Sequence, residues 1–433
     1  MESIWKQSER RNHFDSLEKN IKTDVLVIGG GMAGVLCAFQ LQWAGVPCVL
    51  VEAKTLGSGI TGNTTAKISS QHGLIYQELL RRLGREQAKL YWQANEQALA
   101  QYRNLCREID CDLEEKISFV YSRSDREAIR REAQALKQMG VPVQFTEQLP
   151  LPFPVCGAVG YSKQAQFHPM KFLDAISREL TVYEHTMVRE LKGTTAITNR
   201  GKITAQKIIV ATHFPFINTH GSYFLKMYQY RSYVIALKGA QDVNGIYIDE
   251  DKNGVSLRNY GELLLIGGGG HRTGKQGGNW QQLREFARQY YPDAVETTHW
   301  ATQDCMTLDG MPYIRQYSAA TPNVYVATGF NKWGMTTSMV AATLLTDLIQ
   351  GKNNPFVELF SPSRGILQPQ LARNAWEAAI GFLTPTLRRC PHLGCALKWN
   401  PQEHSWDCSC HGSRFTETGQ LIDNPAAGDW KRK

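Results

Sequence analysis

The sequence lacks any long apolar run. No stretch of its 433 residues approaches the roughly 20 consecutive apolar residues that a helix needs to span a bilayer. The first 20 residues are mostly polar and contain no apolar segment like the centre of a secretory signal peptide. We therefore expect a cytoplasmic protein without a membrane span.

The sequence also lacks a clustered stripe of basic residues. Lys and Arg outnumber Asp and Glu by 48 to 40, a net charge of +8, but the basic residues are scattered along the chain. A nucleic-acid-binding protein concentrates them on one face or one helix. We therefore expect no nucleic-acid partner. The 42% apolar and 20% charged residues are ordinary for a globular protein, and the length allows two domains.

Cysteine is sparse in most of the chain and crowded near its end. Four of the ten cysteines lie within residues 390–410. The other six are Cys37, Cys48, Cys106, Cys111, Cys156 and Cys305. Scattered cysteines are typical of core packing. A reducing cytoplasm disfavours a disulfide framework, so the crowded four indicate a metal or redox site.

A βαβ unit is present at residues 24–52. The apolar strand DVLVIG leads into a helical segment, and a second strand, PCVLVE, follows. Gly29, Gly31 and Gly34 have G-x-G-x-x-G spacing: they allow a tight turn, close approach of a pyrophosphate, and close packing of helix on strand, respectively. Glu52 ends the second strand, where a carboxylate can bind ribose hydroxyls. The unit predicts a dinucleotide-binding domain.

Three later segments favour FAD as the dinucleotide. They are a Gly/Thr-rich loop at 57–67, a strand at 203–212 that ends in small residues, and a strand, turn and helix start at 323–338. Together with the βαβ unit, and with ATGFNKWGMT as the most specific later motif, they resemble the D-amino-acid oxidase-like FAD-dependent oxidoreductases, which include glycine and sarcosine oxidases. The resemblance covers most of residues 22–355.

The resemblance implies a set of FAD-binding residues. Gly29, Gly31, Gly34 and Glu52 would hold the ADP half, and the backbone of Val188 would meet the adenine. Thr61, Thr65, Ala66 and Lys67 would lie along the pyrophosphate and flavin, and Gly329, Gly334, Met335 and Thr336 would close over the isoalloxazine. Relatives that act on amino acids often carry a basic residue at the position of Thr336, which weakens the expectation of a carboxylate clamp there. Without an obvious Cys or His beside the flavin loops, we expect non-covalent FAD.

The resemblance also implies an α/β fold: a Rossmann-like FAD-binding domain, an inserted antiparallel-sheet substrate domain, and a small β-rich C-terminal unit. We expect the oxidoreductase at 1–361, a linker and helix at 362–385, and the cluster-binding unit at 386–433. The FAD-binding segments are expected at about 22–75, 165–215 and 310–355, and the substrate-domain segments at about 76–164 and 216–309.

The substrate domain offers only weak pocket candidates. These are Arg231, Tyr233, Arg258, His271 and Lys332, and for each a structural or solvated role is at least an equal alternative. The run GGGGHRTGK at 267–275 nearly matches a phosphate-binding P-loop, but Gln276 follows where Ser or Thr is needed. We interpret this run as a turn.

The crowded cysteines belong to two short boxes, CPHLGC and CSCHGS. Cys390-x-His392 is followed, after fifteen residues, by Cys408-x-x-His411. Two Cys and two His can bind zinc, and they also match a Rieske [2Fe–2S] centre. The two boxes resemble the high-potential Rieske family. This resemblance implies that Cys390 and Cys408 bind one iron and that His392 and His411 bind the other.

The Rieske resemblance also implies a disulfide between Cys395 and Cys410. Ser409 stands where Pro is common, and Phe415 stands where respiratory relatives often have Tyr. Phe415 removes one hydrogen bond toward the cluster, while Ser413 keeps its own, so we expect a potential below that of the respiratory proteins. The unit is also shorter than usual.

The two resemblances together predict an FAD-dependent enzyme that dehydrogenates a small substrate, such as an amine or amino-acid derivative. It would pass electrons singly through the cluster to an external protein or quinone. Two alternatives stay open. In one, a partner donates electrons to the cluster and the flavin reduces a substrate; in the other, the protein is a redox sensor without turnover.

Overall fold

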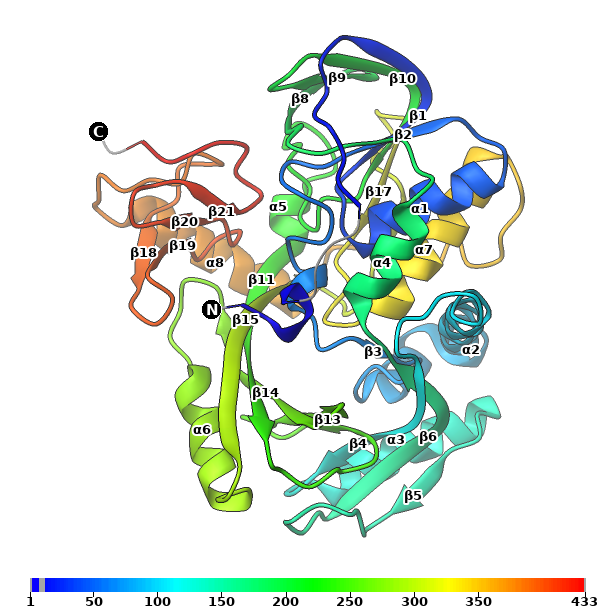
Figure 1. Ribbon diagram of the computed structural model, residues 1–433, viewed down its shortest axis with the longest axis vertical. Helices are drawn as coiled ribbons and strands as arrows, with labels where there is room; N and C mark the ends of the chain where they lie inside the picture. Colours follow the sequence, from blue (N-terminus) through cyan, green and yellow to red (C-terminus); the bar gives the residue numbers. More distant parts are fainter. Residues whose placement is uncertain (1, 8–11, 432–433) are drawn as a thin grey trace.

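The structure is a computed structural model that describes residues 2–7 and 12–431. Residues 1 and 8–11 of the expected oxidoreductase and residues 432–433 of the expected cluster-binding unit lie outside the described part. The strands form three sheets (Figure 1). One is mostly parallel, one is mostly antiparallel, and the third is a small antiparallel sheet near the C-terminus. The predicted fold class is confirmed.

The first sheet grows from the βαβ unit predicted from the sequence. It comprises β1 (Ile21–Ile28), α1 (Met32–Trp43) and β2 (Cys48–Val51), with β1 and β2 paired in parallel. On the other side, β1 pairs in parallel with β10 (Lys202–Val210), which pairs in parallel with β17 (Val324–Thr328). The ends of these strands are apolar and buried, as expected when helices cover a parallel sheet. The remaining strands of this sheet are β7 (Val182–Tyr183), β8 (Val188–Lys192), β9 (Thr195–Thr198) and β16 (Tyr313–Gln316).

Helices cover one face of this sheet (Figure 1). Helix α1 packs against α7 (Gly334–Ile349) and α4 (Pro169–Ser177). Helix α2 (Ile75–Leu105), which has a kink at Gly84, packs against α7 and against α3 (Arg126–Met139). Helix α7 is apolar and buried along most of its length, so it forms the centre of this layer.

The second sheet is the inserted substrate layer. Its strands in spatial order are β15 (Val295–Thr307), β11 (Met227–Lys238), β14 (Leu263–Arg272), β13 (Ser256–Tyr260), β12 (Ile246–Asp249), β4 (Glu114–Ser122), β6 (Gly157–Gln166) and β3 (Lys67–Ile68), and β5 (Gln144–Thr146) pairs with β6. All its pairs are antiparallel except β12 with β4. Helix α6 (Asn279–Tyr290) packs on β14 and β11. Strand β3 joins this layer although it falls within the expected FAD-binding segment 22–75.

The third sheet forms the C-terminal unit. Its strands are β18 (Leu397–Asn400), β19 (Ser405–Cys408), β20 (Arg414–Thr416) and β21 (Leu421–Asp423), paired in that order. Helix α8 (Pro369–Leu383) precedes the unit and contacts the short helix α5 (Tyr223–Lys226). Figure 1 shows the unit beside the ends of β11 and β15. No helix in the described ranges combines the length and apolar character that crossing a bilayer requires.

Candidate cofactor sites

A cavity of about 690 Å³ is lined by residues of both large sheets. Ten of the residues predicted to bind FAD line it: Gly29, Gly31, Glu52, Thr61, Thr65, Lys67, Val188, Gly329, Gly334 and Met335. The other three, Gly34, Ala66 and Thr336, do not. The sequence motifs therefore converge on one cavity although they lie far apart along the chain.

The glycine turn at the start of α1 leaves no room for side chains. A Cβ atom on Gly34 would lie 1.8 Å from the carbonyl oxygen of Gly29, and one on Gly29 would lie 2.6 Å from the carbonyl oxygen of Ala211. Gly29 also has a φ of +111°, which favours glycine. The Met32 N–H donates to Thr61 Oγ1 over 2.9 Å. Gly31 and Ala33, at the turn and the helix N-terminus, line the cavity wall, and a helix N-terminus at this place suits a pyrophosphate.

Glu52 lies at the end of β2, beside this turn. Its carboxylate accepts hydrogen bonds from the N–H groups of Gly30 (2.6 Å) and Lys54 (2.8 Å). Burial raises the pKa of Glu52 more than these two N–H groups lower it. Val188, at the start of β8, lines the same cavity. A carboxylate fixed at this position fits the binding of ribose hydroxyls.

Lys67 is a half-buried amine at the other end of the predicted flavin-binding loop. Its Nζ donates to Thr65 Oγ1 (3.1 Å) and to Ser256 Oγ (3.0 Å). Burial, with the nearby charges of Arg258 and Lys332, lowers the pKa of Lys67 to about 7. Its protonation therefore changes near neutral pH, inside the cavity.

Two predicted flavin contacts face the protein interior. Thr336 Oγ1 donates to the carbonyl oxygen of Ser69 over 3.1 Å and lies 3.1 Å from Nε2 of His72. Ala66 has a φ of +54°, and its carbonyl accepts a hydrogen bond from Arg258 over 3.1 Å. Thr336 and Ala66 therefore lie behind the residues that line the cavity.

The weak pocket candidates divide into two groups. Tyr233 and Lys332 line the cavity, whereas Arg231, Arg258 and His271 do not. Those three contact other buried groups, so a pocket role for them stays a prediction. Arg258 donates to Ala66, His271 Nε2 lies 2.9 Å from the Tyr233 hydroxyl, and Arg231 pairs with Glu403 of the C-terminal unit.

Several cavity residues were not predicted. The second sheet contributes Ser232, Gln303 and Asp304, and burial raises the pKa of Asp304. The C-terminal unit contributes residues 421–424 and 426–429. Local sequence could not identify them, because their position depends on strand pairing and on how the unit packs against the sheet.

The four predicted iron ligands come together in the C-terminal unit. The Cys390, Cys408 and His411 side chains are buried, and the imidazole centroids of His392 and His411 lie 4.8 Å apart. The Nδ1 atoms of both histidines are buried and, within the described ranges, have no hydrogen-bond partner. Buried imidazole nitrogens without a partner beside two buried thiols fit the donor set of a Rieske cluster.

Cys395 and Cys410 lie next to this group. They are free thiols in the structure, and together with Cys408 their Sγ atoms lie within 4.8 Å of one another. A Cβ on Gly381 of α8 would lie 2.5 Å from the Cys410 Sγ, so the helix backbone packs directly on this pair. The implied disulfide stays a prediction.

The departures from the respiratory pattern have structural counterparts. Phe415 is fully buried in the small core of the unit. The Ser413 side chain is within hydrogen-bonding reach of Cys390. A Cβ on Gly274 would lie 2.7 Å from the Ser409 backbone N, so the P-loop-like glycine run forms a close contact with the second cluster loop.

The histidine edge of the cluster site faces the oxidoreductase. His392 Nε2 lies 2.7 Å from Asn218 Oδ1. The Phe214 ring contacts both imidazoles edge-on, with centroids 6.4 Å from His392 and 6.3 Å from His411. Asn424 donates to the Phe214 carbonyl over 2.7 Å and fixes this segment.

Hydrogen bonds to the backbone hold the second cluster loop against the substrate sheet. Gln229 donates to the His411 carbonyl (2.9 Å), and Gln303 donates to the Gly412 carbonyl (3.0 Å). Arg272 donates to the Ser409 carbonyl over 3.1 Å. Because β11, β14 and β15 all contribute, the loop is fixed along its length.

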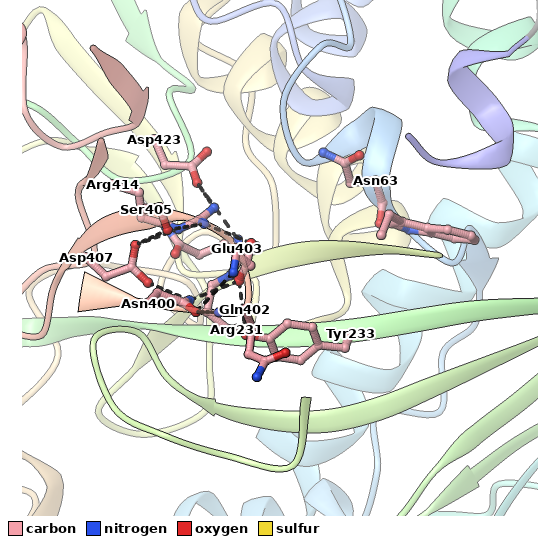
Figure 2. Close-up of polar contacts among 12 residues, drawn as sticks. Asn63, Arg231, Tyr233, Asn400, Gln402, Glu403, Ser405, Asp407, Arg414 and Asp423 are labelled. Atoms are coloured by element: carbon pink, nitrogen blue, oxygen red, sulfur yellow. Dashed lines mark hydrogen bonds and ion pairs between the residues drawn. The ribbon is translucent and has the colours of Figure 1, made fainter. Parts of the chain in front are cut away.

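A buried ion-pair network completes the contact (Figure 2). Glu403 of the C-terminal unit accepts from Arg231 Nε (3.0 Å), Arg414 Nη2 (2.8 Å) and the Tyr233 hydroxyl (3.0 Å). Arg414 also binds Asp407 over 3.0 Å. Burial opposes ionisation of Glu403, but the two guanidinium groups lower its pKa to about 2. We call this set the Glu403 network.

Comparisons with known proteins match two parts of the chain. The FAD dependent oxidoreductase family model matches residues 24–348, and the Rieske [2Fe-2S] domain model matches residues 381–432. The Rieske 2Fe-2S iron-sulfur protein YhfW of Bacillus subtilis is 33% identical, over 98% of this chain and 96% of that protein. The cytochrome b6-f complex iron-sulfur subunit of Nostoc punctiforme is 49% identical over 37 residues, 8% of this chain and 21% of that subunit.

Solved structures resemble the larger part of the chain. Glycine oxidase from Geobacillus kaustophilus matches with a TM-score of 0.67 and 19% identity, over 80% of this chain and 99% of that one. L-proline dehydrogenase from P. horikoshii matches with a TM-score of 0.67 and 18% identity, over 80% and 98%. At these identities the likeness establishes the fold alone.

Proposed function

Because the chain belongs to the FAD-dependent oxidoreductases and ends in a Rieske [2Fe–2S] domain, we propose that it oxidises a small amine or amino-acid derivative and delivers electrons to an external acceptor. This enzyme binds FAD in the first part and a [2Fe–2S] cluster in the second. When bound, FAD takes two electrons from a substrate, whereas the cluster carries one at a time.

One wall segment, residues 211–216, carries the proposal. Thr212, His213 and Phe216 line the FAD cavity, whereas the ring of Phe214 contacts both cluster histidines. A single short stretch of chain therefore separates the two cofactor sites. Together with the Glu403 network, which fixes the unit in place, this supports electron transfer inside one chain.

Lys332 supports a substrate that carries a carboxylate. It lines the cavity, and its Nζ lies 4.3 Å from the centroid of the Tyr230 ring. It stands four residues before Thr336, the position at which relatives that act on amino acids often carry a basic residue. Glycine oxidase and L-proline dehydrogenase have similar folds, and glycine and L-proline each carry an amino group and a carboxylate. We propose that Lys332 orients such a carboxylate.

An anaerobic stopped-flow screen tests the proposal. Candidate amino acids and N-substituted amines are mixed with the purified holoenzyme, and flavin absorbance and the paramagnetic signal of the reduced cluster are followed together. We expect an active substrate to bleach the flavin, after which the cluster becomes reduced. Bleaching with a cluster that stays oxidised would contradict transfer between the sites.

The role of Lys332 has a separate test. Lys332→Met should raise KM for a carboxylate substrate by about tenfold or more, because one charge-assisted hydrogen bond is lost. Lys332→Arg should retain most of the affinity, and the exposed Lys352→Met is the matched control. An unchanged KM in Lys332→Met would exclude the carboxylate contact.

A further inference from the structure

Large apolar side chains that the fold leaves exposed gather in one segment. Seven of the ten such side chains in the described part of the chain lie within residues 366–399. Four of them form what we call the α8 face: Trp376 (67% exposed), Phe382 (48%), Leu383 (82%) and Leu387 (86%). Exposed apolar side chains concentrated in this way mark an interaction surface.

The helical part of the α8 face lies on the outside of α8, and Leu387 follows four residues after the helix ends. Asn374 and Gly381 are its buried positions, and Gly381 packs on the Cys410 Sγ. Trp376 and Leu383 are seven residues apart and therefore share the opposite side. A Cβ on Gly394 would lie 3.9 Å from Phe382, which places the end of this face beside the first cluster loop.

The cluster site is thus approached from two directions. The Phe214 ring and Asn218 of the oxidoreductase close its histidine edge. On the cysteine side, the helix backbone at Gly381 is packed directly on the non-ligand cysteines. An external acceptor that binds at the α8 face would approach the cluster across α8, from its cysteine side, and not from the histidine edge that Phe214 and Asn218 close.

Charge distinguishes the possible occupants of this face. Arg373 and Arg388 are exposed at its two ends. Glu377, the one carboxylate within α8, pairs with Lys275 over 2.8 Å. Exposed Trp, Phe and Leu flanked by arginine, with the α8 carboxylate paired, complement an anionic lipid surface, where Trp also prefers to lie.

We propose that the α8 face binds the surface of an anionic lipid bilayer and presents the cluster to a quinone dissolved in it. The lipid-binding part of the proposal follows from the exposed side chains alone. The quinone part rests on the proposed function and identifies the external electron acceptor as a quinone. Oxidation of a C–N single bond to C=N releases two electrons and two protons, and reduction of a quinone to a quinol consumes two of each. The reaction therefore balances without another oxidant.

Vesicle sedimentation with the full-length holoprotein tests the lipid contact. Phosphatidylglycerol–phosphatidylcholine vesicles should pull down the protein, and pure phosphatidylcholine vesicles should pull down much less. Trp376→Ala and Leu383→Ala should each weaken binding by about tenfold, because each removes one interfacial anchor. Trp43→Ala is the matched control, since Trp43 is 74% exposed on α1 and should bind as the wild type does.

A charge variant distinguishes electrostatic binding to anionic lipid from nonspecific hydrophobic adsorption. Arg373→Gln with Arg388→Gln should reduce binding to anionic vesicles about tenfold or more and leave the weak binding to neutral vesicles unchanged. Retained flavin and cluster absorbance shows that each variant is folded. Failure of the wild type to sediment with anionic vesicles, or equal losses in Trp376→Ala and Trp43→Ala, would overturn the proposal.

Further measurements distinguish failure of the lipid-binding proposal from failure of the proposed enzymatic function. A concentration-dependent dimer in sedimentation velocity that Trp376→Ala abolishes, with no vesicle binding, would assign the face to a second copy and overturn the proposal. Vesicle binding needs no substrate, so it tests the surface even when no substrate bleaches the flavin. Once a substrate is known, quinol formation can be measured. The quinone part is supported if quinol forms only with anionic vesicles and Leu383→Ala abolishes it. The quinone part is overturned if a variant loses vesicle binding and still forms quinol.

Discussion

Two regions of the molecule are built in different ways: the FAD cradle, which is the glycine turn and strand end at residues 29–52, and the cluster interface, where the C-terminal unit packs against the substrate sheet. The cradle is one continuous βαβ unit, in which Gly29, Gly34 and Glu52 lie within 24 residues of one another. The cluster interface combines β11, β14 and β15 with loops near the end of the chain, and it buries the Glu403 network. The cradle has no room for a Cβ atom at Gly29 and Gly34, whereas the interface contains buried ion pairs such as Arg231 with Glu403. Mutations should therefore disrupt the cradle through steric overlap and the interface through unpaired charge.

The largest effect should come from the cradle. Gly34→Ala places a Cβ 1.8 Å from the Gly29 carbonyl oxygen, and backbone atoms cannot rotate away as a side chain can. We expect a protein without bound FAD, measured as flavin released per chain after denaturation. Gly365→Ala, outside the cavity and with nothing within 4 Å of its Cβ, should retain FAD. Full occupancy in Gly34→Ala would show that the turn can rearrange.

At the interface, Glu403→Ala should have the next largest effect. It leaves the buried Arg231 and Arg414 without their shared carboxylate, and such a loss costs about 3–5 kcal/mol of unfolding free energy. Urea unfolding followed by tryptophan fluorescence measures it. The exposed Glu417→Ala on the same unit should differ from the wild type by less than about 0.5 kcal/mol. Equal stabilities would mean that the network contributes little.

The same network predicts a loss of stability in acid. The pKa of Glu403 is about 2 in the folded protein, below its ordinary value of 4.5, so its contribution is fully present above pH 4.5. As the pH falls from 4.5 toward 2, the unfolded chain binds the proton first, and about 3 kcal/mol is lost progressively. The difference in unfolding free energy between the wild type and Glu403→Gln, measured at several pH values, should narrow over this window. A constant difference would argue against ionised Glu403.

Steric overlap at the interface should have a smaller effect than in the cradle. Gly381→Ala brings a Cβ within 2.5 Å of the Cys410 Sγ and 3.4 Å of the Cys395 Cβ. We expect a cost of about 1–3 kcal/mol and a lower iron content, because α8 must shift away from the cluster unit. Gly365→Ala, with open space around its Cβ, is the control. Normal iron content together with wild-type stability would show that α8 can move freely.

The smallest expected change is in the cluster potential. Ser413→Ala removes a hydroxyl within reach of Cys390 and should lower the midpoint potential by roughly 60 mV, the one-electron equivalent of about 1.4 kcal/mol. A redox titration monitored by paramagnetic resonance measures it. Ser405→Ala removes a buried hydroxyl that accepts a hydrogen bond from Arg414 (2.8 Å), so it should change stability more than potential. An unchanged potential in Ser413→Ala would exclude the hydrogen bond to sulfur.

The sequence by itself determined the features that depend on neighbouring residues. The βαβ unit, its glycines and the two Cys/His boxes were predictable because short spacing within one segment sets their geometry. The fold class followed from resemblance and is confirmed.

Only the tertiary structure decided which distant residues meet. Arg231 pairs with Glu403 rather than lining the cavity, and Phe214 and Asn218 face the cluster histidines. Strand register and the packing of the C-terminal unit fix these contacts, and neither leaves a local pattern. A buried charge must find its partner wherever the folded chain provides one, so the partner cannot be read from adjacent residues.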